Sequence, residues 1–158
     1  MSVSKTFCIY PWDHLATLTN GDIIPCCVAE NDNQLSLHNM TFQEAWNSPT
    51  MKEIRKKMMA GETVQACQRC FAEEASGIDS HRVRSNRYMV NITGPFEQLL
   101  ANTSADGHYS GPIRSVDLRL SNVCNLMCIM CRPHESSKWA GELAKVGAFV
   151  SNEKLFQF

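Results

Sequence analysis

The sequence places three cysteines, Cys124, Cys128 and Cys131, at a CxxxCxxC spacing directly after an alternating run of apolar and polar residues. Three thiolates in so short a loop form a set of metal ligands. A four-iron cluster has four corners and is usually held by four cysteines, so a loop that supplies three leaves one iron free. The loop is therefore a candidate site of chemistry at that free iron.

Four more cysteines, Cys8, Cys26, Cys67 and Cys70, form a second set, the last two at a CxxC spacing. Four thiolates close every corner of a four-iron cluster, and they suit tetrahedral zinc equally well. Two cysteine sets in one chain, one with only three ligands, favour iron–sulfur clusters over zinc. A zinc-stabilised interaction protein remains an alternative.

Composition indicates the setting of these thiols. The 158 residues are 44% apolar and 20% charged, and the N-terminus lacks the apolar run of a signal peptide. We therefore expect a reducing, cytoplasmic environment, in which clustered cysteines are ligands and not disulfides. No stretch approaches the roughly 20 apolar residues of a membrane span. The formal net charge of −1 gives no support for a nucleic-acid partner.

A hairpin is predicted to position one ligand of the second set. Residues 14–19 and 22–27 flank Asn20-Gly21, the dipeptide typical of a two-residue type I′ turn. Neighbouring strand residues point to opposite faces, so at most one of Cys26 and Cys27 joins the site of Cys8. We choose Cys26 as the ligand and Cys27 as a packing thiol.

Helices are predicted from their start and stop signals. A capping box at residues 41–44 begins a short helix through Trp46, and Ser48-Pro49 begins a second that ends at Gly61. The second helix has a core stripe and a solvated cationic face. A basic patch later in the chain is expected to be a solvated helix face, with contacts to an anionic cofactor or substrate as the alternative. The core stripe is Met51, Ile54 and Met58, the cationic face is Arg55, Lys56 and Lys57, and the basic patch spans residues 81–87.

The remaining elements follow in order along the chain. A helix over residues 71–76 follows the CxxC pair, residues 91–112 form a linker or long loop, and a strand spans 115–120. A helix from about residue 136 to 146 follows the cysteine loop. His134 and Trp139 are expected to be surface or core residues.

Residues 7 to about 88 resemble the twitch domain, a shortened relative of the SPASM domain that carries auxiliary iron–sulfur clusters. The resemblance depends on several short features in a specific order. They are Cys8 with Pro11-Trp12, Asn20-Gly21 with Pro25-Cys26, Trp46-Asn47-Ser48, Arg55, and Cys67 with Cys70. It implies an auxiliary [4Fe-4S] cluster, fully ligated by Cys8, Cys26, Cys67 and Cys70, that serves electron transfer or structure.

The CxxxCxxC loop resembles the signature of the radical S-adenosylmethionine (radical SAM) superfamily. The resemblance implies that Cys124, Cys128 and Cys131 hold a second [4Fe-4S] cluster whose free iron binds S-adenosylmethionine. The reduced cluster would cleave it to a 5′-deoxyadenosyl radical that abstracts a substrate hydrogen. The family usually has an aromatic residue near the adenine where this chain has Met130, whose soft thioether also packs on rings. An external electron donor and an unidentified substrate, by analogy a peptide or protein, are the implied partners.

The expected fold is α+β, with a cysteine-rich domain of a β-hairpin plus helices at 1–88 and a linker at 89–112. Residues 113–158 would form the first strand, cluster loop and first helix of an incomplete radical SAM (β/α) barrel. Only residues 132–158 follow the last cysteine, about enough for one helix and the start of a strand. We therefore expect the N-terminal portion of a larger enzyme, truncated or split, whose second chain would complete the barrel.

On this expectation the chain carries no catalytic residue and is inactive alone. Besides the zinc alternative, a non-catalytic iron–sulfur module for electron transfer or docking remains open.

Overall fold

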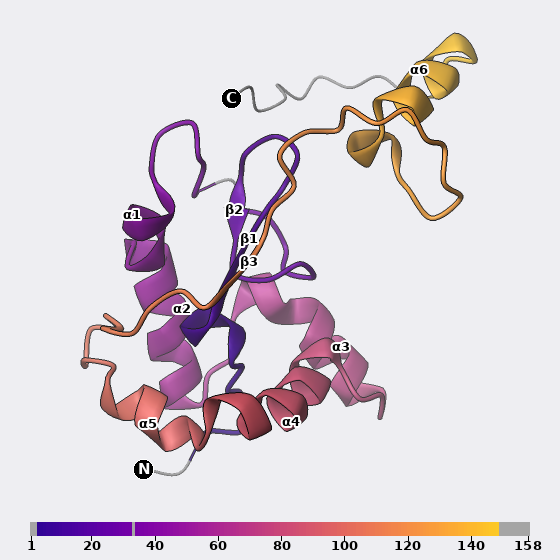
Figure 1. Ribbon diagram of the computed structural model, residues 1–158. Helices are drawn as coiled ribbons and strands as arrows, with labels where there is room; N and C mark the ends of the chain where they lie inside the picture. The colour runs from indigo at the N-terminus through magenta and orange to yellow at the C-terminus, as the bar shows by residue number, and fades with distance from the viewer. Residues whose placement is uncertain (1–2, 33, 149–158) are drawn as a thin grey trace.

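The computed structural model describes residues 3–32 and 34–148. Residues 1–2 and 33 of the predicted domain at 1–88, and residues 149–158 of the predicted barrel unit at 113–158, lie outside the described residues. A three-stranded sheet of order β2-β1-β3 lies at the centre, with α1 and α2 beside it and α3, α4 and α5 below (Figure 1). An arm that carries the cysteine loop and α6 extends away from this body. The elements are η1 Tyr10–Trp12, β1 His14–Thr17, β2 Ile23–Ile24, α1 Phe42–Trp46, α2 Pro49–Ala60, η2 Gln65–Cys67, α3 Gln68–Ala75, α4 His81–Thr93, α5 Phe96–Ala101, β3 Ser115–Asp117, η3 Pro133–Glu135 and α6 Ser137–Lys145.

The predicted hairpin is present as β1 and β2, but the prediction of its turn was wrong. Ala16 pairs with Ile24, and the carbonyl of Leu18 accepts from the Gly21 amide at 2.9 Å. The loop therefore contains three residues, 19–21, and ends on Gly21 with φ of 86°. Three-residue hairpin loops commonly combine a type I turn with a left-handed residue that glycine supplies without steric cost.

The third strand joins the two halves of the sequence. β3 runs parallel to β1, with His14 opposite Ser115 and Ala16 opposite Asp117. Its ladder covers half of the strand predicted at residues 115–120, and the Arg119 amide continues the contact by donating to Thr17 Oγ1 at 2.8 Å. The strand of the predicted barrel unit is thus an extension of the N-terminal hairpin sheet.

The first two helices begin and end at the predicted residues. Thr41 and Glu44 form both hydrogen bonds of the capping box at the start of α1. Ser48 caps α2, and Gly61 ends it with φ of 80°. These are local signals that need no tertiary contact, which is why the sequence predicts them well.

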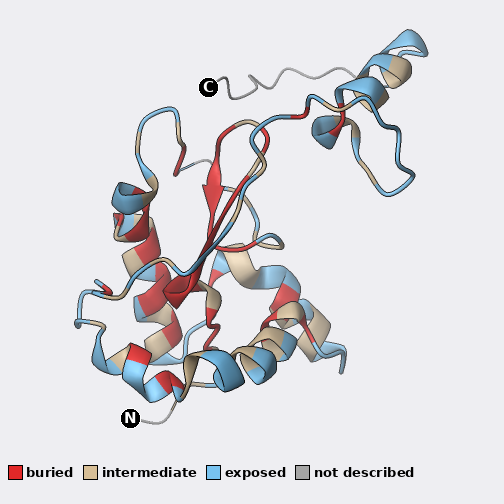
Figure 2. Ribbon diagram, viewed as in Figure 1, coloured by how far each residue is buried: buried red, intermediate tan, exposed pale blue. Residues whose placement is uncertain are grey.

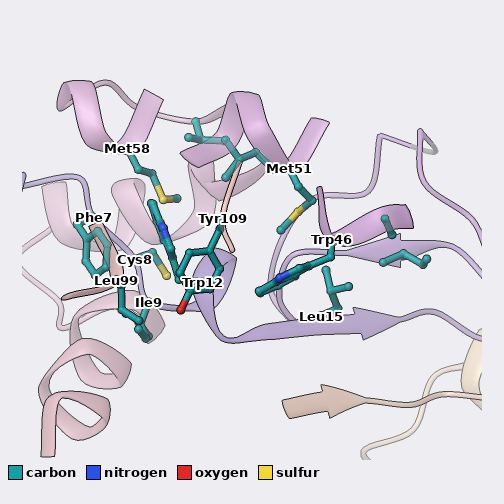
Figure 3. Packing of buried hydrophobic residues seen from close by; sticks show 14 of the residues in the cluster. Phe7, Cys8, Ile9, Trp12, Leu15, Trp46, Met51, Met58, Leu99 and Tyr109 are labelled. Carbon is teal, nitrogen blue, oxygen red and sulfur yellow. The ribbon is translucent and has the colours of Figure 1, made fainter. Parts of the chain in front are cut away.

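The core lies between the sheet, α2 and the segments before β1 and after α5. Trp12, Leu15, Met51, Met58 and Tyr109 are almost completely buried, and Figure 3 shows them packed around the start of β1. The predicted core stripe of α2 is confirmed. Buried residues gather in the sheet and α2, whereas α6 has none (Figure 2).

Arg55 was predicted on a solvated face, and this prediction was wrong. The side chain is completely buried and lies over the Trp46 ring, with Cζ 4.6 Å from the ring centroid. Its guanidinium donates to the carbonyl of Pro11 at 2.7 Å, to that of Trp46 at 2.8 Å and to Asn47 Oδ1 at 2.9 Å. Arg55 therefore replaces water at carbonyls of η1 and α1 and ties these elements to α2.

Residues predicted as a linker contribute to the core. Phe96, Leu99 and Tyr109 are buried, and the Trp12 indole donates to Thr103 Oγ1 at 2.8 Å. The Trp46 indole donates to a carbonyl of the same segment, that of Gly111, at 2.9 Å. The segment thus packs on the N-terminal part, while the domain boundaries themselves remain a prediction.

Candidate functional site

Four cysteines from separate parts of the chain line one cavity in the N-terminal body. Cys8 precedes η1, Cys26 follows β2, Cys67 caps α3, and Cys70 lies in the first turn of that helix. Cys8, Cys26 and Cys70 are buried, and Cys67 is half-buried. The structure thus brings together all four residues that the sequence singles out as the second set. Their role as ligands remains a prediction.

Burial favours the protonated form of the Cys8, Cys26 and Cys67 thiols when no metal is bound. It raises the pKa of Cys8 well above its ordinary value, that of Cys26 to about 11 and that of Cys67 to about 12. The neighbouring thiols add to each shift. Backbone hydrogen bonds from Tyr10 to Cys8 and from Val28 to Cys26 oppose it. Such amides stabilise sulfur charge once a metal centre displaces the protons.

The structure separates the adjacent pair Cys26 and Cys27. Cys26 is 7% exposed and lines the cavity, whereas Cys27 is exposed and does not line it. The Cys27 sulfur lies 3.8 Å from Nε2 of His81, a residue that lines the cavity. The prediction that Cys27 is a packing thiol was therefore wrong, and the role of Cys26 as a ligand remains a prediction.

The CxxC pair lies at the beginning of a helix, as predicted. Cys67 is the N-cap residue of α3, and Cys70 lies three residues later. Backbone amides of the first turn have no partner within the helix, and the helix dipole is positive at this end. Both effects favour negative charge at this end of α3.

The basic patch at residues 81–87 is only partly solvated, which corrects the prediction. Arg87 is exposed and pairs with Asp79 at 3.0 Å. Arg82 is 6% exposed, lines the cysteine cavity and forms a salt bridge with Glu74 of α3. The burial of Arg82 depends on contacts with residues far away in the sequence, so it could not be predicted from the basic patch alone.

Two aromatic side chains also line this cavity, and neither was predicted to lie there. Tyr10 and His81 both line it, and their rings stack at 5.2 Å between centroids with an interplanar angle of 14°. Tyr10 follows Cys8 by two residues, which was the only signal in the sequence. His81 comes from the distant helix α4.

The CxxxCxxC loop lies on the arm. Cys128 is exposed, and Cys124 and Cys131 are half-buried. Desolvation and then the nearby thiols Cys128 and Cys124 raise the pKa of Cys131, so the three sulfurs interact. Met130 is 85% exposed and borders a groove next to the hairpin turn, so its predicted role at an adenine remains a prediction.

Residues at the start of α6 support this loop. The Trp139 indole donates to the Cys128 carbonyl at 2.9 Å, Ser136 Oγ donates to the Leu126 carbonyl at 2.9 Å, and the Cys124 amide donates to Ser137 Oγ at 3.2 Å. Trp139, expected to be a plain surface or core residue, therefore contacts the loop directly. The carbonyl of His134 accepts from the hairpin residue Thr19 at 3.0 Å.

Comparison with known families adds one finding. Residues 8–71 match the family model of SPASM, an iron–sulfur cluster-binding domain. The SPASM segment begins at Cys8, ends just after Cys70 and so contains all four cysteines of the cavity. It supports iron–sulfur binding for this part of the chain, and it does not extend to the CxxxCxxC loop.

The other comparisons gave no match. No curated protein and no solved structure is similar to this chain. None of the helices in the described part of the chain has both the length and the apolar character needed to cross a membrane. All eight cysteines are free thiols in this structure.

Proposed function

We propose that this chain is an iron–sulfur protein with two [4Fe-4S] sites and belongs to the radical SAM enzymes. The observation that carries the proposal is that Cys8, Cys26, Cys67 and Cys70 line one cavity inside the segment that matches an iron–sulfur domain. Four thiolates satisfy all four irons of a cluster. This auxiliary cluster would transfer electrons or stabilise the fold, in a reducing, cytoplasmic compartment.

The domain match favours a cluster over a single zinc ion. Four thiolates suit tetrahedral zinc as well as a four-iron cluster. The cavity cysteines, however, lie within a segment that matches an iron–sulfur cluster-binding domain.

The second site is proposed at Cys124, Cys128 and Cys131, with Met130 beside the bound S-adenosylmethionine. The support is the radical SAM-like spacing, the proximity of the three sulfurs and the hydrogen bonds from α6 that fix the loop. When bound and reduced by an external donor, such a cluster supplies reductive cleavage of S-adenosylmethionine to a 5′-deoxyadenosyl radical. An unidentified substrate, a peptide or protein by analogy, and a second chain that completes the barrel would be the partners.

One observation favours a second candidate function, a non-catalytic iron–sulfur module. Next to the cysteines of the loop, Ile129 is 97% exposed and Met130 is 85% exposed. Radical chemistry requires a site that excludes water, because solvent quenches reactive intermediates. An exposed cluster suits electron transfer to a docked partner.

Metal and sulfide analysis after anaerobic reconstitution tests cluster binding. We expect iron and acid-labile sulfide in equal amounts in the unsubstituted chain. Cys26→Ala should lose the auxiliary cluster, while the matched variant Cys27→Ala should retain it. Bound zinc without sulfide would contradict the cluster proposal.

Addition of S-adenosylmethionine to the reduced protein separates the two candidate functions. A radical SAM site should show an altered electron paramagnetic resonance spectrum that Cys128→Ala abolishes, and it should release 5′-deoxyadenosine. An intact second cluster whose spectrum does not respond to S-adenosylmethionine would instead support the non-catalytic module.

A further inference from the structure

Helix α4 lies outside the SPASM segment but borders the proposed auxiliary site. The segment ends at residue 71, and α4 begins at His81. His81 and Arg82 nevertheless line the cavity together with the four cysteines. The wall of the site thus includes a helix that the domain match does not cover.

Asn86 of α4 fixes the backbone on both sides of Cys8. Its Oδ1 accepts from the Ile9 amide at 2.9 Å, and its Nδ2 donates to the Phe7 carbonyl at 2.8 Å. One side chain therefore satisfies a donor and an acceptor of the residues that flank the cysteine. Cys8 precedes η1 and belongs to no strand ladder of the described chain, so side chains must set its backbone position.

Arg82, one helical turn before Asn86, connects the same segment to the helix with the CxxC pair. Its Nη1 donates to the Phe7 carbonyl at 2.7 Å and to the Lys5 carbonyl at 2.9 Å. Its Nε donates to Glu74 Oε1 at 3.0 Å, and Glu74 belongs to α3. Arg82 thus couples the position of Cys8 to that of Cys67 and Cys70.

We propose that Asn86 and Arg82 are positioning residues of the auxiliary cluster site, so that the functional unit extends through α4. This inference rests on the proposed cluster binding. A cluster needs each of the four sulfurs within about 0.5 Å of its ligating position, which flexible backbone does not provide. Without Asn86 the Cys8 thiol would shift, and the centre would lose its fourth ligand.

The test uses Asn86→Ala in a chain whose loop cysteines Cys124, Cys128 and Cys131 are replaced by alanine. Asn91→Ala is the matched control, because Asn91 is exposed on the same helix and its side chain donates to the Arg87 carbonyl of that helix at 3.5 Å. We expect Asn86→Ala to release iron to a chelator at least about 10-fold faster, as for other residues that orient metal ligands. Its electron paramagnetic resonance spectrum should change, whereas that of Asn91→Ala should not.

A second measurement needs no cluster. In the metal-free chain, alkylation of Cys8, followed by mass spectrometry, should be faster in Asn86→Ala than in Asn91→Ala, since the buried thiol becomes accessible. Alkylation of Cys70, which α3 positions independently, should change less. Equal alkylation of Cys8 in the two variants would overturn the inference.

A further control separates positioning from general destabilisation. Leu99→Ala removes core packing from α5, and its stability can be compared with that of Asn86→Ala in the same unfolding assay. At matched stability, Leu99→Ala should leave the cluster spectrum unchanged. The same spectral change in both variants would contradict a positioning role. No iron in the unsubstituted chain would instead contradict the proposed function.

Discussion

At the scale of single residues, Arg55 connects η1, α1 and α2 through buried hydrogen bonds. Arg55 is a completely buried cation whose described partners are carbonyl and amide oxygens and aromatic rings, with no carboxylate among them. Each of its hydrogen bonds satisfies an oxygen that the fold removes from water. Substitution of such a residue lowers the free energy of unfolding, because it leaves these buried oxygens without a donor.

Arg55→Met should destabilise the protein by at least about 3 kcal/mol, because several buried oxygens lose their donor at once. Urea unfolding of the metal-free protein measures this change in the free energy of unfolding. The matched control is Lys56→Met at the next, partly exposed position, which should change stability by no more than about 0.5 kcal/mol. Equal effects of the two substitutions would contradict the structural role of Arg55.

The cavity thiols predict a pH dependence of the metal-free fold. The pKa of Cys26 is raised from 9.0 to about 11 by burial, so the folded state binds this proton more tightly than the unfolded state. The resulting stability is complete below pH 9 and is lost as the pH rises towards 11, by on the order of 2 kcal/mol. The stability difference between the unsubstituted chain and Cys26→Ala should fall by that amount, as measured by unfolding between pH 7 and 11.

The exposed neighbour provides the control for this titration. The difference between the unsubstituted chain and Cys27→Ala should decline less over the same range, because the Cys27 side chain is exposed and contributes less to the raised pKa of Cys26 than burial does. A parallel decline for both variants would show that the loss arises elsewhere in the protein.

At the scale of elements, local sequence signals predicted the helix ends correctly, whereas contacts between distant parts of the chain could not be predicted. The caps of α1 and α2 depend on residues three positions apart, and both were predicted. The hairpin was predicted, but its loop length depends on strand pairing that a dipeptide does not determine. The burial of Arg55 and Arg82 depends on carbonyls tens of residues away, for which the sequence offers no pattern.

The segment after α5 shows how tightly a predicted linker can pack. Gly107 has φ of 84°, and a Cβ atom at this position would lie 2.2 Å from the Lys52 carbonyl oxygen of α2. Gly61 has nearly the same φ of 80°, but a Cβ atom there would meet nothing within 4 Å. The two glycines therefore have nearly the same backbone conformation, but only at Gly107 does another part of the backbone leave no room for a side chain.

Gly107→Ala should destabilise the protein more than Gly61→Ala. Both substitutions carry the left-handed backbone cost of about 1–2 kcal/mol, and Gly107→Ala adds a clash of about 1–3 kcal/mol. Chemical unfolding of the two variants side by side gives the difference. Equal losses would mean that residues 102–111 do not pack on α2 as described.

At the scale of the whole molecule, the chain consists of a cysteine-lined body and an arm that share one sheet. The sequence predicted both cysteine sets and placed Cys8, Cys26, Cys67 and Cys70 within one domain, and the SPASM match covers these four cysteines. It could not predict that β3 adds to the hairpin, because strand pairing between distant segments leaves no local pattern. The parallel pairing of β1 and β3 connects the domain with the proposed auxiliary site to the strand that leads into the CxxxCxxC loop.

The central claim is that Cys8, Cys26, Cys67 and Cys70 hold an iron–sulfur cluster. The most direct test is iron, zinc and sulfide analysis of an anaerobically reconstituted chain in which Cys124, Cys128 and Cys131 are replaced by alanine. The account predicts about four irons and four sulfides per chain and no bound zinc. Zinc without sulfide, or iron that persists after Cys8, Cys26, Cys67 and Cys70 are also replaced, would contradict it.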